Sequence, residues 1–233
     1  MTTKASGLTT VSETCAFEVF SDDMARVCAN ALAFIPARSQ VMTARVEVWP
    51  DGFRVTGTDG YAIGQDTAKL EEYDGPPDGV TFHVTREALA ELDSAGRKDK
   101  KGYGKLTFKP DDGLIFRPAN NDVATAVQDV SDKANAELWP AIDGLLERLE
   151  RKEPALPELV CFDPALLMRF SKVKAAKKTT AKGNNLERAM DLCIFNNEEP
   201  ILVRIGATFR GCIMPIKREV HRENVEEGDG GLW

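Results

Sequence analysis

The order strand, helix, strand, strand, strand recurs three times along this chain of 233 residues, and this recurrence constrains the fold more than any other feature. The three copies share the order of their elements but show no clear sequence identity. A structural repeat of this period is typical of architectures in which similar units are stacked or arranged in a circle. The chain therefore has to be understood as three related units.

The first unit is predicted between Cys15 and residue 70. A strand at Cys15–Phe20 leads into a helix over 21–35, for which Ser21 supplies the N-cap and which Pro36 stops. Alternating apolar and polar residues then predict half-buried antiparallel strands. These strands span 41–49, 53–58 and 61–70.

The second and third units repeat this order. The second has a strand at 80–84, a helix capped by Thr85 that frays at 94–96, and strands at 104–110, 113–118 and 122–130. The third has a strand at 159–162 and a helix that Asp163 caps, with Pro164 at its first position. That helix is predicted to reach residue 178, and strands follow at 190–195, 201–205 and 209–216.

These elements define the expected domain boundaries. We expect a flexible N-terminus at 1–14, a two-unit domain at 15–131, a linker at 132–157, a third unit at 158–218 and a disordered acidic tail at 219–233. The linker contains Trp139-Pro140 and a short apolar helix over 142–149. The tail ends in Leu232-Trp233, which either docks in an apolar pocket or is simply a disordered end.

The composition is that of an ordinary soluble domain, with 42% hydrophobic and 29% charged residues. A net charge of −7 argues against a generally basic nucleic-acid binder. Five scattered cysteines without a CxxC pair indicate buried thiols in a reducing compartment, not a disulfide frame or a zinc site. Neither a signal-peptide core nor an apolar run of membrane-spanning length is present, so we expect a cytoplasmic protein.

No plausible catalytic set occurs in the sequence. The only histidines are His83, between Phe82 and Val84 in a predicted strand, and His221, in the charged tail. The sequence has no glycine-rich phosphate loop, no GxSxG and no HExxH. We therefore predict a protein that is not an enzyme and that needs no cofactor or metal.

The segment 163–182 is the strongest local departure from the acidic composition. It holds six basic residues and one aspartate. Lysines on one face of its helix would attract phosphates without reading sequence; the alternative is a solvated helix end, where cations are favoured by the helix dipole. The candidate DNA-binding residues are Arg169, Lys172, Lys174, Lys177, Lys178 and Lys182, extended by Arg97 and Lys98 after the second helix.

Two apolar segments, 55–63 and 210–218, are each interrupted by a tight turn or a proline. Segments of this kind can form the two walls of a groove that receives a peptide. The simpler interpretation of the first is an ordinary turn, because Asp59-Gly60 is a common turn dipeptide.

Three motifs resemble the bacterial replicative sliding clamp, the beta subunit of DNA polymerase III. Residues 56–63 (Thr-Gly-Thr-Asp-Gly-Tyr-Ala-Ile) resemble the family's Ala-Thr-Asp-Gly-His-Arg-Leu turn, and residues 138–142 (Leu-Trp-Pro-Ala-Ile) resemble its Phe-Pro-Asp-Tyr segment. Residues 212–217 (Cys-Ile-Met-Pro-Ile-Lys) are similar to its terminal Val-Val-Met-Pro-Met-Arg-Leu. The motifs occur in the family's order and with comparable spacing, over about residues 15–218.

The resemblance implies an α+β clamp fold, with antiparallel sheets outside and helices lining a ring around duplex DNA. It implies partners as well: a DNA polymerase and other replication proteins that bind through an apolar groove, and a clamp loader. Carried over by position, the groove residues are Thr58, Gly60, Tyr61, Ile63, Pro140, Leu145, Cys212, Met214, Pro215 and Ile216. The resemblance thus implies a DNA tether that performs no chemistry.

This chain departs from the family pattern. A family chain has three domains of two units, whereas this one matches the middle domain and the second half of the last; Ala62 stands where the family's turn has arginine. A ring of twelve units would need four copies, length alone indicates three, and a dimer or an open, monomeric form is the remaining alternative. The small size fits a phage-encoded member.

Two other functions remain open from the sequence. A clamp-like decoy or regulator would bind replication partners through the same groove without encircling DNA. An unrelated α+β module would use the basic segment to bind RNA or DNA.

Overall fold

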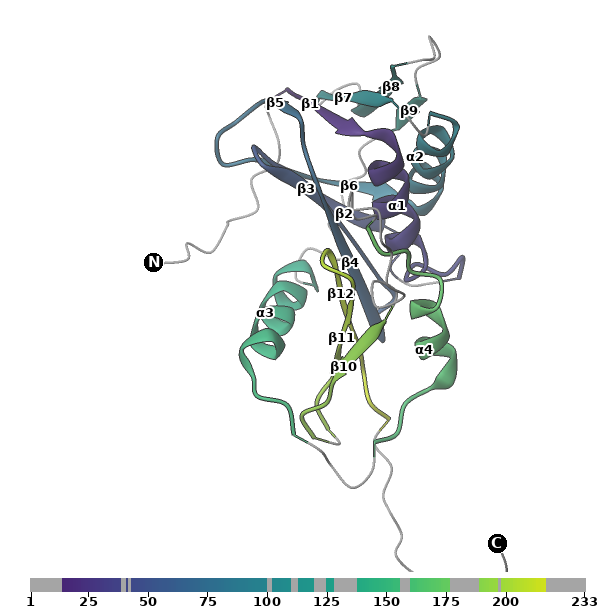
Figure 1. Cartoon of the computed structure of the whole chain (residues 1–233), viewed down its shortest axis with the longest axis vertical. Helices are drawn as coiled ribbons and strands as arrows, with labels where there is room; N and C mark the ends of the chain where they lie inside the picture. The colour runs from purple at the N-terminus through teal and green to yellow at the C-terminus, as the bar shows by residue number, and fades with distance from the viewer. Residues whose placement is uncertain are drawn as a thin grey trace, which may run out of the picture.

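The computed structural model describes residues 14–38, 41, 43–99, 102–109, 113–119, 125–127, 138–155, 160–176, 189–196 and 198–216. Within these residues the chain forms two antiparallel sheets with helices packed on them (Figure 1). Residues 1–13 of the predicted flexible terminus, the whole predicted acidic tail at 219–233, and residues 122–124 and 128–130 of one predicted strand lie outside the described residues.

The first two units have the predicted order. The first comprises β1 (Cys15–Phe20), α1 (Ser21–Leu32), β2 (Thr43–Trp49), β3 (Gly52–Thr58), β4 (Ala62–Lys69) and a short added strand, β5 (Glu72–Asp74). The second comprises β6 (Val80–Thr85), α2 (Arg86–Lys98), β7 (Tyr103–Lys109), β8 (Gly113–Pro118) and β9 (Thr125–Val127). We call these two units together the first domain.

The two units of the first domain exchange their first strands. β1 leaves its own unit and pairs with β7, while β6 pairs with β2. One sheet therefore has the order β5-β1-β7-β8-β9, and β6-β2-β3-β4 belongs to the other. The inward residues of both sheets and both helices share one core, in which the rings of Phe82 and Phe108 stack at 4.8 Å. Neither unit could bury its apolar residues alone.

Helices α1 and α2 pack directly on each other between the sheets. Gly96 of α2 lies so close to α1 that a Cβ atom there would come within 2.6 Å of the Ser21 carbonyl oxygen. The prediction that α2 frays at residues 94–96 is wrong, because this packing holds the helix to Lys98.

The third unit extends the second sheet. It contains α4 (Pro164–Phe170), β10 (Met190–Cys193), β11 (Ile201–Ile205) and β12 (Phe209–Ile213), and it is preceded by α3 (Leu138–Arg151). β12 pairs with β4 over five residues, so one sheet continues across the boundary in the order β10-β11-β12-β4-β3-β2-β6. The last strand of the third unit thus joins β4 of the first unit.

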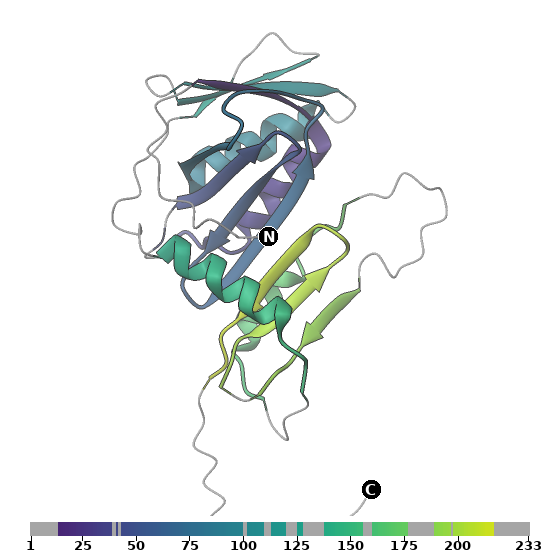
Figure 2. The same ribbon diagram turned by 90° about the vertical axis from the view of Figure 1, so that its left-hand side faces the viewer.

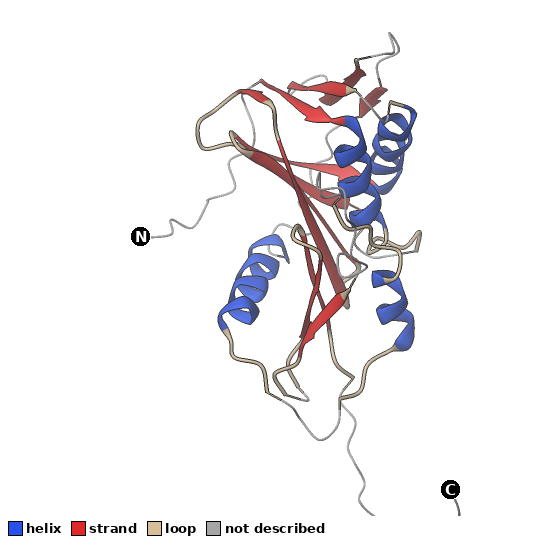
Figure 3. Ribbon diagram, viewed as in Figure 1, coloured by secondary structure: helices blue, strands red, loops and turns tan. Residues whose placement is uncertain are grey.

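The helices divide between the two faces of this seven-stranded sheet. α1, α2 and α4 lie on one face and α3 on the other (Figures 1 and 3). The alternation of β4 and β12 shows the same division: Ala62 and Ile213 pack with α4, whereas Ile63 and Cys212 pack with α3. Figure 2 shows α3 crossing from the strands of the first domain to those of the third unit.

Three local predictions about helices are wrong in detail. The Ser21 hydroxyl does not cap α1 but donates to Asp99 Oδ2, and α1 ends at Leu32. The apolar helix of the supposed linker is longer than predicted, since α3 starts at Leu138. Finally, α4 ends at Phe170, not residue 178, because the side chain of Asn30 captures the backbone N–H and C=O of Lys174.

The strand predicted at 159–162 is absent from the described residues 160–162, which form no ladder with another strand. The Cys161 carbonyl accepts one hydrogen bond, from the Ile216 N–H at 2.8 Å. The predicted N-caps of α2 and α4 are confirmed: Thr85 Oγ1 accepts from Ala88 N–H, and Asp163 Oδ1 accepts from Ala165 N–H.

Candidate partner-binding site

The pairing of β4 with β12 brings the two segments of the predicted groove together. Ile63 lies directly opposite Cys212 in this ladder. Just beyond the ladder, Met214 N–H donates to the Tyr61 carbonyl at 2.9 Å. Residues separated by about 150 positions in the sequence therefore form one continuous surface.

The turn before β4 is fixed by its own polar groups. Thr58 Oγ1 accepts from Gly60 N–H at 3.0 Å, and Asp59 Oδ1 accepts from the N–H groups of Tyr61 and Ala62. Gly60 has a φ of 91°, a conformation that a residue with a Cβ rarely adopts. Because the backbone is fixed in this way, the Tyr61 side chain projects outward and is 67% exposed.

The ten predicted groove residues divide into an exposed and a buried group. Tyr61, Met214 and Ile216 are exposed large apolar side chains, and Gly60, Pro140, Leu145 and Pro215 are exposed or half-buried. Thr58, Ile63 and Cys212 are buried. Burial also raises the pKa of the Cys212 thiol to about 12. The exposed group can touch a partner, while the buried group supports the surface from below.

α3 covers Ile63 and Cys212 and forms the third side of this surface. Its residues Trp139, Ile142, Leu146 and Leu149 are buried against the sheet. Asp143 of α3 accepts hydrogen bonds from Arg45, whose guanidinium also lies 5.4 Å from the centre of the Trp139 ring. His83 lies beside the same ring, at 5.5 Å between centroids, in the structural position that its strand context predicted. Leu145 is thereby held against the cluster that contains Ile63 and Cys212. Pro140 is exposed in the first turn of α3, next to Trp139, and is not brought to the β4–β12 junction by any of these contacts.

The predicted DNA-binding residues do not form one helix face. Lys172 and Lys174 are exposed in the turn and extended chain that follow α4, and Lys177, Lys178 and Lys182 lie outside the described residues. Arg169 is mostly buried and forms an ion pair with Asp59 at 2.6 Å. The pKa of Arg97 is raised by its hydrogen bond to Asp93, one turn earlier in α2, while Lys98 is exposed.

A buried polar network between α1, β4 and the third unit was not predicted. Asp66 of β4 is fully buried and accepts from Arg26 and Asn30 of α1. Arg26 also donates to Thr208, and Asn30 holds the backbone of Lys174. An aspartate in an apolar strand was the only sequence signal for this network. It ties α1 to the third unit.

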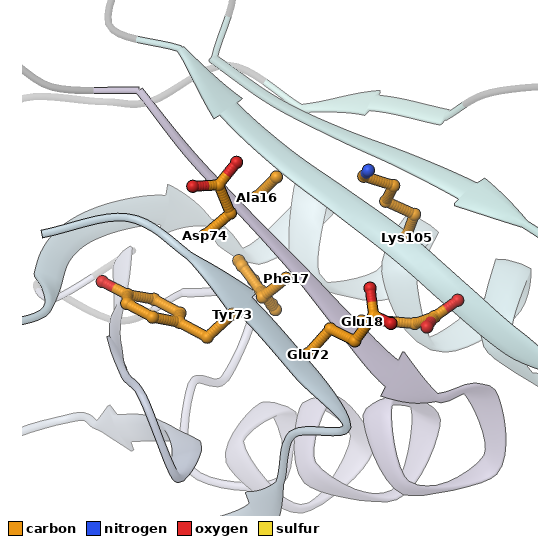
Figure 4. A pocket seen from close by; sticks show the side chains of 7 residues that line it. All are labelled: Ala16, Phe17, Glu18, Glu72, Tyr73, Asp74 and Lys105. Atoms are coloured by element: carbon orange, nitrogen blue, oxygen red, sulfur yellow. The ribbon is translucent and has the colours of Figure 1, made fainter.

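A hollow of about 460 Å³ lies away from these residues, on the five-stranded sheet that contains β5, β1 and β7 (Figure 4). Three carboxylates, Glu18, Glu72 and Asp74, and one lysine, Lys105, line it. It contains none of the candidate site residues. In the part of the chain that the structure describes, no group of histidines, cysteines and carboxylates has the arrangement of a metal site. Among the same residues no helix is long and apolar enough to cross a membrane.

The arrangement of the sheets and helices is that of the DNA polymerase sliding clamps, the beta subunits of DNA polymerase III. The clamp of Pseudomonas aeruginosa superposes with a TM-score of 0.62 and 12% identity, over 87% of this chain and 66% of that one. The Thermotoga maritima beta subunit gives 0.61 and 12%, over 94% and 68%. The predicted α+β clamp fold is confirmed.

This chain is shorter than the clamps it resembles. It spans 65% of the length of a putative beta subunit from Eubacterium rectale, to which it is 11% identical with a TM-score of 0.56. No protein-family model matches the sequence. A search of the curated proteins found no match either. The likeness is therefore one of fold.

Proposed function

We propose that this protein is a clamp-type tether that holds a DNA polymerase and other replication proteins to duplex DNA through a peptide-binding surface at the β4–β12 junction. One observation carries the proposal. In a chain with the sliding-clamp fold, exposed Tyr61 lies beside exposed Met214 at the junction, and Ile216 follows two residues further on. Leu145 of α3 packs against the cluster that contains Ile63 and Cys212. These are the positions at which the motif resemblance puts the groove.

The chemistry of this surface fits a short apolar peptide. Its side chains are aromatic, thioether and aliphatic, and its backbone is fixed by the turn at Gly60 and by Pro215. A rigid apolar surface binds an extended segment with little ordering cost, and a leucine or phenylalanine of the segment can be buried there. These side chains favour binding of an apolar segment, which is the activity that we propose for the surface.

The DNA-binding part of the proposal rests on the helix layer. α1, α2 and α4 lie on a common face, and exposed Lys172, Lys174 and Lys98 extend from the ends of α4 and α2. Lysines that contact phosphates without base contacts would give the sequence-independent attraction that sliding requires. A ring of twelve units would need four copies of this chain and would call for a loader to open it.

The groove is tested with a fluorescently labelled peptide that carries a leucine and a phenylalanine and is taken from the C-terminus of a clamp-binding polymerase. Tyr61→Ser and Met214→Ser should each weaken its binding by about tenfold, because each removes an apolar side chain from the contact. Tyr103→Ser is the matched control, since Tyr103 is also exposed but lies on β7, in the sheet that does not contain β4 and β12. If neither groove substitution changes the affinity, the groove assignment is wrong.

A second function is favoured by the charges on the helix face. Arg169 and Arg97 are both paired with carboxylates, and α1 carries Asp22 and Asp23 in its first turn. These pairings leave less free positive charge than the sequence indicated, as expected for a decoy that binds replication partners without DNA.

The two functions differ in their retention on DNA. A ring that encircles DNA stays on a closed circular plasmid and is lost when one cut linearises it. A decoy that binds the labelled peptide is retained on neither form. Lys172→Glu with Lys174→Glu should reduce retention of the ring and its salt dependence, without changing peptide affinity.

A further inference from the structure

The first domain shows what a clamp unit needs in order to be complete. Each unit there receives the first strand of the other: β6 covers the edge of β2, and β1 covers the edge of β7. The apolar residues of the two covered strands are consequently buried. Val46 of β2 is 4% exposed and Leu106 of β7 is 3% exposed.

The third unit lacks this cover. β10 occupies the place of β2 and β7 as the strand after the helix, but among the described residues it is the edge of its sheet. Met190 and Leu192 lie opposite Ile205 and Val203, which pack with α4, so both side chains point toward the helix layer. Leu192 is nevertheless 39% exposed, and Met168 on α4 is 67% exposed.

The third unit also carries the strand segment that such an edge requires. In the first domain, the carbonyl of Glu18, three residues before α1, accepts from Glu71 N–H, in the chain that follows β4. In the third unit the carbonyl of Cys161, three residues before α4, accepts from Ile216 N–H, in the chain that follows β12. Residues 160–163 are therefore placed as β1 is, and no described residue pairs with the edge that β1 offers to β7.

We propose that the third unit pairs with the third unit of a second copy of this chain, forming a complete two-unit clamp domain across a two-fold axis. Residues 160–163 of each copy add to β10 of the other, and the two α4 helices face each other as α1 and α2 do. A two-fold axis makes both pairings at once, because each copy has one free segment and one free edge.

The register follows from the faces of the side chains. Phe162 packs with the cluster on the helix side, as do the cross-strand partners of Met190 and Leu192. Cross-strand neighbours point to the same face, which allows Phe162 opposite either Met190 or Leu192 of the partner subunit. We propose the first register, which sets Cys161 opposite the partner's Asp191. Both Cys161 and Asp191 then lie on the outer face, where the Asp191 side chain is exposed.

This register gives a direct test on the full chain. Asp191→Cys should form an intermolecular disulfide with the native Cys161 of a second copy under mild oxidation, seen as a dimer on a non-reducing gel. The double variant Asp191→Cys/Cys161→Ser should give none. A dimer that persists in the double variant would mean that β10 pairs with β10, and would overturn the proposed pairing.

The apolar contact is tested by sedimentation at micromolar concentration. The unmodified chain should sediment as a dimer or as a larger even assembly. Met190→Ser with Leu192→Ser should weaken this association at least about tenfold, because each loss occurs twice across the axis. Asp191→Ser, on the opposite face of the same strand, is the control. A monomeric unmodified chain, or equal effects of the two variants, would contradict the proposal.

The inference does not depend on DNA binding, because a decoy could dimerise in the same way. Two chains joined through their third units hold six units, half of the proposed ring. Dimerisation without retention on circular DNA would support the proposed interface and contradict the proposed ring.

Discussion

The first domain and the third unit are built from the same order of elements but reach different degrees of burial. In the first domain two units exchange strands, and their apolar residues share one core. Among the described residues the third unit contacts the first domain through β12, α3 and the hydrogen bonds of α1, and its other edge exposes Met190 and Leu192. The stability of a clamp unit therefore comes from its neighbours more than from its own elements.

α3 compensates for part of this difference. It is additional to the repeated unit and lies on the outer face, where Asp143 binds Arg45 of β2 and Glu150 binds Arg210 of β12. It therefore attaches the third unit to the first domain at both ends. The same helix carries Leu145, which packs at the β4–β12 junction, so in the proposed function attachment and partner binding would share one element.

The largest expected effect comes from removing this attachment. Trp139→Ala empties a site that is almost fully buried between α3, Arg45 and His83, and it should cost about 3–5 kcal/mol of unfolding free energy. We expect urea denaturation to show two transitions, with the third unit unfolding first. Glu147→Ala, exposed on the same helix, should cost less than about 0.5 kcal/mol. A single transition at the original midpoint would show that α3 does not hold the third unit.

The second-largest expected difference between the first domain and the third unit is in the reactivity of their cysteine thiols. Cys15, Cys28 and Cys212 are buried in the first domain or at the junction, and burial raises the pKa of each; that of Cys15 rises from 9.0 to about 11. Near pH 8 their thiolate fractions fall by about 100-fold or more, so they should react far more slowly than in the unfolded chain. Cys161 and Cys193, half-buried in the third unit, should be labelled first.

The raised thiol pKa values also predict a pH dependence. The folded chain keeps the Cys15 proton up to about pH 11, whereas the unfolded chain loses it near pH 9. Stability from this group is therefore complete below pH 9 and is lost as the pH rises toward 11.

The order in which the thiols react is measured by mass spectrometry of the alkylated peptides. Equal rates for Cys15 and Cys193 would contradict the difference in burial.

The starts of α2 and α4 were predictable from the sequence, because the cap residue of each helix bonds to that helix's own first turn. Thr85 and Asp163 each cap the helix that starts next to them, and Pro164 adds a fixed φ. Ser21 has the same signal, yet its hydroxyl binds Asp99, which is 78 residues away. The end of α4 was predicted eight residues too late for a similar reason, because Asn30 of α1 takes the backbone of Lys174. Tertiary hydrogen bonds of this kind leave no periodic pattern.

The candidate site shows the same limit. The turn at Gly60 and the proline after Met214 were visible as motifs, and the structure places them side by side. The burial of Ile63 was not predictable, because it depends on α3 lying over the junction. The burial of Cys212 agrees with the buried thiols predicted from the scattered cysteines. The missing strand at 160–162 has a comparable cause: a first strand of a clamp unit pairs with another unit, and within one chain that other unit is absent from the described residues.

A smaller effect is expected where the first domain holds the end of α4. Asn30→Ala removes two hydrogen bonds to the Lys174 backbone and one to Asp66, which should cost about 1–3 kcal/mol. The Lys174 amide should also exchange with solvent faster. Lys174→Ala is the matched control, since it keeps the backbone bonds and should change stability by less than about 0.5 kcal/mol. Equal losses for the two variants would mean that the lysine side chain, not Asn30, holds this segment.

The smallest effect compares the caps of the two regions. Thr85→Ala in α2 and Asp163→Ala in α4 should each cost about 0.5–2 kcal/mol, because each leaves a backbone N–H of the first turn without an acceptor. α2 has 13 residues and packs along α1, whereas α4 has only seven. A helix of two turns forms few hydrogen bonds of its own, so amide exchange should accelerate throughout α4 but only at the start of α2.

Asp163→Asn separates the cap from the charge, since asparagine is also a good N-cap and should restore slow exchange in α4. If exchange accelerated equally across both helices, the third unit would be as firmly held as the first domain, and the contrast between them would fail. If α4 alone lost protection and the loss vanished when the chain dimerised, the partner's α4 would be supplying the packing that α1 gives α2.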